Sequence, residues 1–326
     1  MMKKQSNVTK FLFSTILLMV VVLISLFSGK YQLSLTEILS ANEEQLRVFL
    51  TLRLPRTLMA LAAGFALGAA GMVYQTVFRN SLASPDMIGV TSGASAGAAF
   101  AILFLGGSFA AVTGSAFIGS MLALVIALLL ASLSKGNSSS LILAGIAVHS
   151  IAQTTLMLLK LCADPERELA SIEYWIMGSL NGITLKKIPG ALLIVALCFL
   201  ALTLLYRQIL LLSVDEDEAA LLGVSVGKMR LLILILATLM ISAVISVTGI
   251  ISFVGLLAPH SARLLLKNHR LPTFFLSAMI GSMILCLADI LARTAAASEL
   301  PVSVFTSLLG APFLLFLLMR RRDERG

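Results

Sequence analysis

Few residues of this chain could do chemistry, and they are scattered. The three histidines, His149, His260 and His269, lack the spacing of a metal site, and neither an H-E-x-x-H nor a G-x-S-x-G motif is present. The phosphate loop of ATP-binding proteins is also absent, because Gly227-Lys228 has no glycine five positions earlier and is followed by Met229. The sequence therefore predicts no catalytic residue, no metal site and no cofactor, and any ATP that powers the protein is bound by another subunit.

The composition is that of a membrane protein. Hydrophobic residues make up 59% of the 326 residues and charged residues only 12%, with a mean hydropathy of +1.01. A soluble domain carries about 25% charged residues to cover its surface. These values exclude a soluble enzyme and a nucleic-acid-binding protein. The net charge of +8 is typical of a membrane protein with basic cytoplasmic loops.

Apolar runs without Asp, Glu, Lys or Arg predict the membrane-spanning helices, each of which needs about 20 residues. The runs are 11–29, 57–78, 87–134, 136–159, 188–206, 231–259, 271–288 and 300–319. The third run is long enough for two spans, and Gly106-Gly107 offers a turn inside it. The run that ends at Pro259 is also too long for one span. Pro259 would disrupt a continuing helix, so the run is either one long helix that ends in the basic loop after it or a span of about 20 residues followed by a short return crossing.

The distribution of basic residues selects the second interpretation. Both ends of the chain are rich in Lys and Arg, which are enriched on the cytoplasmic side, so the number of crossings should be even. We therefore expect an all-α integral membrane protein of ten transmembrane helices, with a short eighth helix near 256–267 and both termini cytoplasmic. Residues 1–326 form one transmembrane domain. The first apolar run exceeds the length of a signal peptide's apolar core, which favours a retained first span.

A proton-coupled transporter usually carries ionisable residues inside its spans, and here only His149 and Asp289 are candidates. Asp289 lies four residues before Arg293, so a helical ion pair explains it. His149 shares a helical stripe with Gly145 and Gln153, and this stripe either lines a polar pathway or packs against another helix. Both alternatives stay open, and with them the hypothesis of a proton-coupled secondary transporter.

Small residues recur at the spacing of closely packed membrane helices. One set lies on the second span and one on the third: Gly64, Gly68 and Gly71, then Gly89, Gly93 and Gly97. This pattern predicts tight helix packing.

Eight stretches in order resemble one family, the FecCD-type permease subunits of ATP-binding-cassette importers for iron–siderophore complexes, haem and cobalamin. They are RLPR (53–56), GFALGAAGMVYQTVFRNSLASPDMIGVTSGASAG (64–97), LILAG (141–145), YWIMGSL (174–180), EAALLGVS (218–225), SFVGLLAPHSARLL (252–265), LADILAR (287–293) and ELPVSVFTSLLGAPFLLFLL (299–318). The resemblance implies the type II importer fold with ten helices in the cell membrane. It also implies several partners: a second permease subunit, identical or different, two cytoplasmic ATPase subunits and an extracytoplasmic substrate-binding protein.

The resemblance also implies roles for particular residues. Arg53, Arg56 and Arg293 would accept acidic residues of the binding protein, rather than anchor to lipid headgroups. The loop 212–228 would form the coupling helix that contacts the ATPase. The residues that would make that contact are Glu218, Ala219, Ala220, Leu222 and Gly223. Asn137 and Ser138 would lie in a cytoplasmic gate, although composition alone predicts a flexible loop equally well.

We therefore expect a transport subunit, not an enzyme, that moves an iron–siderophore inward. Haem or cobalamin is the alternative substrate within the same family.

Overall fold

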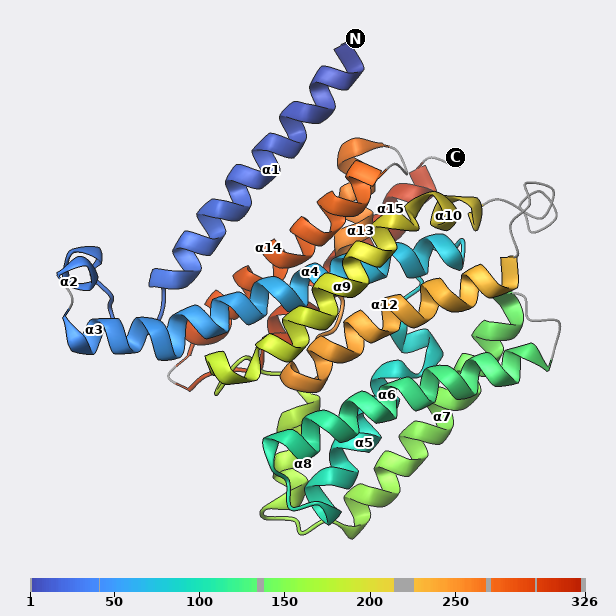
Figure 1. Cartoon of the computed structure of the whole chain (residues 1–326), viewed down its shortest axis with the longest axis horizontal. Coiled ribbons are helices and arrows are strands. Elements are labelled where there is room, and N and C mark those ends of the chain that lie inside the picture. The colour runs from blue at the N-terminus through green and yellow to red at the C-terminus, as the bar shows by residue number, and fades with distance from the viewer. Residues whose placement is uncertain are drawn as a thin grey trace.

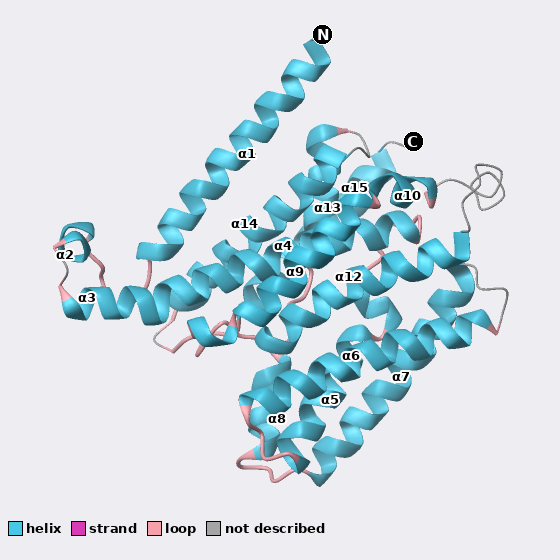
Figure 2. Cartoon of the chain, in the orientation of Figure 1, coloured by secondary structure: helices cyan, strands magenta, loops and turns pink. Residues whose placement is uncertain are grey.

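The computed structural model consists of helices joined by loops, and it describes residues 2–40, 42–133, 138–213, 226–267, 271–296 and 298–323 (Figures 1 and 2). No strand occurs among these residues. In chain order the helices are α1 (Met2–Phe27), α2 (Leu35–Leu39), α3 (Glu43–Val48), η1 (Phe49–Arg53), α4 (Leu54–Val77), η2 (Pro85–Ile88), α5 (Val90–Phe104), α6 (Phe109–Ser132), α7 (Ser138–Cys162), α8 (Glu168–Ile176), η3 (Leu185–Lys187), α9 (Pro189–Leu204), α10 (Tyr206–Leu211), α12 (Val226–Thr248), α13 (Val254–Leu266), α14 (Leu271–Thr294) and α15 (Val302–Asp323).

Six helical segments of the described chain are long and apolar enough to cross a membrane. They are Val8–Phe27, Glu43–Val77, Phe109–Ser132, Ser139–Cys162, Val226–Thr248 and Leu271–Thr294. Four shorter apolar helices, α5, α9, α13 and the first part of α15, lie between and after them. The order of the long and short helices follows the apolar runs of the sequence. The start of α1 and the end of α15 lie toward the same end of the bundle (Figure 1).

The two overlong apolar runs are each divided by an irregular segment. The predicted turn at Gly106-Gly107 is found between α5 and α6, where both glycines have positive φ angles of 72° and 63°. The second division lies at 249–253, directly before α13 (Val254–Leu266), which lies close to the short helix expected near 256–267. Pro259 sits inside α13, whose Gly255 carbonyl, the group that would accept the missing hydrogen bond, packs against Gly71 of α4 instead.

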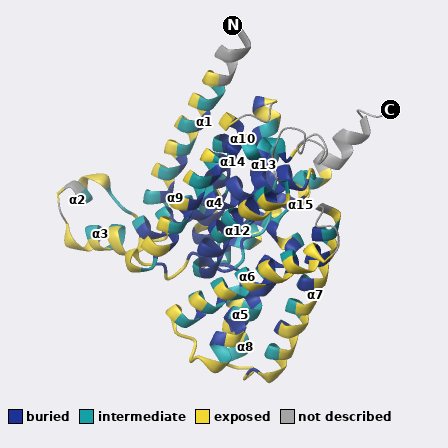
Figure 3. Cartoon of the chain, turned by 45° about the vertical axis from the view of Figure 1, so that its right-hand side comes forward, coloured by how far each residue is buried: buried dark blue, intermediate teal, exposed yellow. Residues whose placement is uncertain are grey.

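Helix α4 forms the centre of the larger part of the bundle and packs against α12, α13 and α14. In the segment that contains α4, 83% of the most apolar stretch is buried, against 17% in α1, and Figure 3 shows this contrast. A second group consists of α5, α6, α7 and the short α8. Its connection to the rest runs mainly through α12, which packs against both α6 and α9.

Glycines allow the backbones of these helices to touch. A Cβ on Gly64, Gly68 or Gly71 would lie within 2.4 Å of a carbonyl oxygen of α14 or α13. On α5, Gly93 and Gly97 approach α6 equally closely, since a Cβ there would lie 2.4 and 2.1 Å from carbonyl oxygens of Gly119 and Ser115. Such contacts are the close approach that small residues permit in membrane bundles.

Gly89 is an exception to the predicted stripe. It lies one residue before α5, not within it, with φ of +78°, and it packs on the backbone of His149. A left-handed backbone at this junction favours glycine.

The predicted coupling residues Glu218, Ala219, Ala220, Leu222 and Gly223 lie outside the described residues, as does Asn137. Ser138 is the first residue of α7.

Candidate functional site

An irregular turn positions the first two predicted docking arginines. Residues Phe49–Arg53 form a π-helical turn that joins α3 to α4, and Pro55 occupies the first turn of α4. Because proline has no N–H, the backbone hydrogen-bond ladder that runs from α3 into α4 lacks one donor at this position. Turns of the π type are frequent at functional sites. This one brings Arg53 and Arg56 to the end of the bundle where α14 finishes.

A fully buried carboxylate holds Arg56 and Arg293 together. The Arg56 Nε donates to Asp289 Oδ1 at 2.6 Å, and Arg293 Nη2 lies 3.1 Å from Asp289 Oδ2. Asp289 is 0% exposed, and the predicted ion pair between Asp289 and Arg293 is confirmed. Arg56 also donates through Nη1 to Glu299 Oε2 at 2.7 Å, from the loop before α15. The cluster therefore links α4, α14 and the start of α15.

Helix α1 joins the same cluster through hydroxyl groups. Arg293 Nη2 donates to the Ser25 carbonyl oxygen at 3.0 Å and contacts Ser25 Oγ at 2.8 Å. Ser25 Oγ in turn shares a hydrogen bond of 2.9 Å with Thr57 Oγ1 on α4. Because a charged donor in a low-dielectric setting forms strong hydrogen bonds, these contacts fix the end of α1 against α4 and α14.

Arg53 lies beside this cluster, against the chain that follows α1. Its Nη2 donates to the Tyr31 carbonyl oxygen at 3.1 Å. The guanidinium packs on Gly29, where a Cβ would fall 1.8 Å from Arg53 Nη1. Gly29 also has φ of +149°, so both its backbone and this contact require the absence of a side chain.

The three arginines line one cavity of about 340 Å³, named here the arginine cavity. Its other lining residues include Lys30, Glu299 and the segment 180–184. With Asp289 behind the wall, three arginines face two carboxylates, so the cluster has an excess positive charge. Arg53, Arg56 and Arg293 are only 7%, 7% and 2% exposed in this chain. Their guanidinium groups therefore contact protein groups and not bulk solvent.

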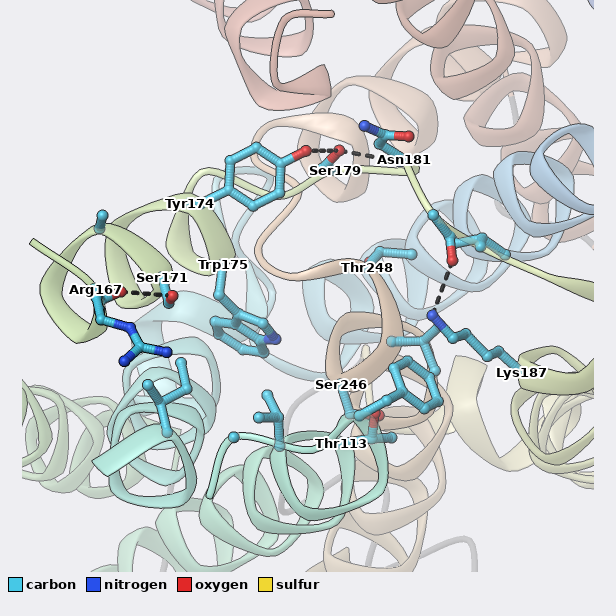
Figure 4. Close-up of a pocket in the computed structure, with 18 of the residues that line it drawn as sticks. Thr113, Arg167, Ser171, Tyr174, Trp175, Ser179, Asn181, Lys187, Ser246 and Thr248 are labelled. Carbon is cyan, nitrogen blue, oxygen red and sulfur yellow. Dashed lines mark hydrogen bonds between the residues drawn. The ribbon is translucent and has the colours of Figure 1, made fainter. Parts of the chain in front are cut away.

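A larger pocket of about 640 Å³ opens at the same end of the bundle, between α8, the ends of α5 and α6, and the end of α12. We call it the α8 pocket. Figure 4 shows Arg167, Ser171 and Trp175 on one side and Lys187 and Thr248 on the other. Its volume is typical of small-molecule sites, which measure about 300–1,000 Å³.

Polar and aromatic groups alternate around the α8 pocket. Lys187 Nζ donates to the Gly182 carbonyl oxygen at 2.8 Å and lies 4.4 Å from the centre of the Phe109 ring. Tyr174 and Ser179 share a hydrogen bond of 3.1 Å at its rim (Figure 4). Thr113 Oγ1 is buried without a hydrogen-bond partner among the described residues. The pocket can therefore contact both apolar and hydrogen-bonding groups of a bulky ligand.

The predicted stripe on α7 faces the start of α5. His149 Nδ1 shares a hydrogen bond of 2.6 Å with Ser92 Oγ, and a Cβ on Gly145 would lie 2.4 Å from the Met87 carbonyl oxygen. Gln153, one turn further on, is half-buried. At Gly145 and His149 the stripe therefore contacts a neighbouring segment of the same chain.

Two members of the arginine cluster were missed in the sequence. Glu299 was read only as part of a motif, and Ser25 as one residue of an apolar span. The Asp289–Arg293 spacing was a usable signal because the two residues share a helix. Contacts of Arg56 with residues more than 200 positions away left no such signal.

Comparisons with a family model and with known proteins point to the same transport family. The model of the FecCD transport family matches residues 17–320. The hemin transport system permease protein HmuU of Yersinia pestis is 36% identical, with 96% of each chain covered. The ferric enterobactin transport system permease protein FepG of Escherichia coli is 37% identical over 84% of this chain and 82% of its own.

The comparison extends to other substrates and to solved structures. The molybdate import system permease protein MolB of Haemophilus influenzae is 32% identical over 96% of this chain and 95% of its own. A solved structure described as a metal-chelate type ABC transporter in an inward-facing conformation superposes with a TM-score of 0.89 at 33% identity, covering 95% of this chain and 98% of that one. This chain is thus a multi-pass membrane permease of the ABC transporter class, and it belongs to the FecCD transport family.

Proposed function

We propose that this chain is the permease subunit of an ATP-driven importer for an iron–siderophore complex. The observation that carries this proposal is the match along nearly the whole chain to a metal-chelate type transporter, together with several relatives named for iron chelates. In the proposed topology the chain crosses the membrane ten times with both termini in the cytoplasm. The six long and four short apolar helices of the described chain support this number.

The importer requires partners that this chain does not supply. Two permease subunits, identical or different, pair around the substrate path, and two ATPase subunits dock on the cytoplasmic side. The loop 212–228 is the proposed ATPase contact. A soluble binding protein delivers the chelate at the opposite end of the bundle, where the arginine cavity lies.

The arginine cavity is the proposed docking position for acidic residues of that binding protein. Its excess positive charge supports this role, because charge complementarity steers encounter and fixes register. Arg53 is the arginine best suited to accept an external carboxylate, since its guanidinium pairs with a backbone carbonyl and not with a carboxylate. Glu299 is 34% exposed at the side chain and occupies the Arg56 side of the cavity.

Transport by the assembled complex tests the proposal. The permease would be reconstituted into liposomes with its partner subunits, and uptake of a ferric siderophore, hemin, cyanocobalamin and molybdate would be compared. We expect vanadate-sensitive, ATP-dependent uptake of the ferric siderophore. If the complex took up only hemin, cobalamin or molybdate, that compound would be the substrate in place of the siderophore. Uptake that needs no ATPase subunit would overturn the proposal of an ATP-driven importer.

The docking role needs a separate test in which the fold is preserved. Arg53→Glu should weaken binding of the binding protein while the complex stays assembled. Arg56→Glu is a poor probe, because it would place a carboxylate against buried Asp289. Normal affinity for the binding protein in the Arg53→Glu complex would refute the docking assignment.

A further inference from the structure

Two irregular segments meet deep inside the bundle. The first runs from Arg79 to Gly89 and contains η2, and the second is the break at 249–253 between α12 and α13. The Met87 carbonyl packs on Gly145, which lies seven residues into α7, or about 10 Å from the start of that helix. The second segment leads into Gly255, which packs on Leu67 at the middle of α4.

These segments, with residues of α4 and α12, line a partly open cavity of about 260 Å³, named here the central cavity. It is lined by Leu67, Ser84, Pro85, Asp86, Thr91, Ile241, Ile245, Ile251, Ser252, Phe253, Gly255 and Leu256. Phe253 has φ of +66°, a strained backbone for an aromatic residue. Strained residues of this kind persist where the surrounding structure holds them, and they cluster at functional sites.

Irregular backbone at this depth does not face lipid. Unsatisfied backbone groups are tolerated inside a membrane only where protein buries them or where they line a water-filled cavity. Ser84, Asp86 and Ser252 on the two segments are half-buried or exposed in this chain. We therefore expect the central cavity to contain water or to contact a hydrated ligand.

Asp86 also indicates that the central cavity contacts water, and its carboxylate adds a negative charge. It is exposed, and its carboxylate has no hydrogen-bond or ion-pair partner among the described residues. Among the described residues, no Lys or Arg lines the central cavity. A charged side chain inside a membrane faces the bundle interior or water, not lipid. Asp289, by contrast, is buried between two arginines.

Building on the proposed function, we propose that the central cavity opens onto the path between the two permease subunits and that Asp86 acts there as a charge filter. Its carboxylate gives the central cavity a negative potential that admits neutral or cationic chelates and opposes anionic ones. Ferric iron held by hydroxamate groups forms a neutral complex, whereas catecholate groups give a strongly anionic one. A negative potential at the path therefore favours a hydroxamate-type chelate over a catecholate one.

The potential can be measured without any transport assay. Thr91 lines the cavity beside Asp86, so Thr91→Cys, in a Cys162→Ser background that removes the exposed native thiol, reports on access. The assembled complex in liposomes would be treated with two membrane-impermeant thiosulfonates of similar size, one cationic and one anionic. After each rate is divided by that reagent's rate with a free thiol, we expect the cationic reagent to react about tenfold faster than the anionic one. This is the effect of one neighbouring unit charge in a partly hydrated site.

Variants of Asp86 supply the matched comparison. Asp86→Asn should bring the ratio of rates to that of a free thiol, while Asp86→Glu should keep it. Leu129→Cys should react with neither reagent. Leu129 is 61% exposed on an apolar helix, so in the membrane it faces lipid, where the charged reagents do not reach it. An unreactive Thr91→Cys, or a ratio that Asp86→Asn leaves unchanged, would overturn the proposal. The second result would mean that a cation of a partner subunit neutralises Asp86.

Competition between chelates then connects the potential to selectivity. In the reconstituted importer, Asp86→Asn should raise uptake of a ferric tricatecholate relative to a ferric trihydroxamate by about tenfold or more. An unchanged preference would refute the filter. If no chelate were taken up but the labelling ratio still depended on Asp86, the proposed function would fail and the charged aqueous cavity would stand.

Discussion

Replacing Asp289 by asparagine should strongly destabilise the protein. The Asp289 carboxylate is fully buried and lies 2.6 Å from Arg56 Nε and 3.1 Å from Arg293 Nη2. Asparagine preserves the shape of the side chain but leaves two guanidinium groups opposite the single carboxylate of Glu299. Breaking a buried ion pair by removing one partner costs about 3–5 kcal/mol, because it leaves an uncompensated buried charge.

The assay is unfolding of the detergent-solubilised permease, followed by temperature or by a denaturing detergent. Glu299→Gln is the matched control, since the same change is made at a carboxylate that is 34% exposed. Exposed pairs contribute about 0–1 kcal/mol, so the control should unfold close to the unmodified protein. In the double variant, Asp289→Asn with Arg293→Gln, charge balance is restored, and part of the lost stability should return.

Two results would refute this reasoning. A loss in Asp289→Asn no larger than in Glu299→Gln would mean that the buried cluster contributes little to stability. Strictly additive losses in the double variant would mean that Asp289 and Arg293 act independently, contrary to their contact.

The remaining predictions concern packing, protons and coupling. Gly71→Ala should prevent correct folding, measured by yield of monodisperse protein, because its Cβ would lie 1.9 Å from a carbonyl oxygen of α13, whereas Gly114→Ala, with nothing within 4 Å, should be neutral. His149→Ala should leave uptake dependent on ATP and insensitive to an uncoupler; loss of a proton-dependent component would instead support a secondary transporter. Ala219→Arg, in the proposed coupling loop, should release or uncouple the ATPase, and unchanged ATPase stoichiometry and transport would remove that assignment.

Much of the helical pattern was predictable because it depends on local composition. Apolar runs and basic ends are properties of short stretches, and they indicate each helix without knowledge of its neighbours. The division of 231–259 was harder. The excess length of this run and the basic residues after it indicated a separate short helix near 256–267, and α13 starts two residues earlier, at Val254. The break itself begins at Gly249, whose positive φ of 73° the sequence does not reveal. Pro259 is accommodated because the group it leaves unpaired contacts another helix.

The site was predictable only where its partners are near in sequence or share a known motif. Asp289 and Arg293 are four residues apart, and their ion pair followed from that spacing. The contact between Ser25 and Arg293 joins the first predicted span to the end of the ninth, and nothing local marks either residue as the other's partner. Burial of the three arginines was likewise unexpected, because arginine near a membrane boundary usually extends toward water.

Asp289 and Asp86 illustrate why burial and pairing must be considered before function. Asp289 drew attention in the sequence because it lies within a predicted span, yet its charge is compensated by Arg56 and Arg293 and serves to hold helices together. Asp86 lies between spans, in a short irregular segment, and was read only as part of a motif. Asp86 lines a cavity in which the described residues include no Lys or Arg, at a depth where an exposed charge requires water. Of the two, the uncompensated carboxylate is the one that can act on a passing ligand.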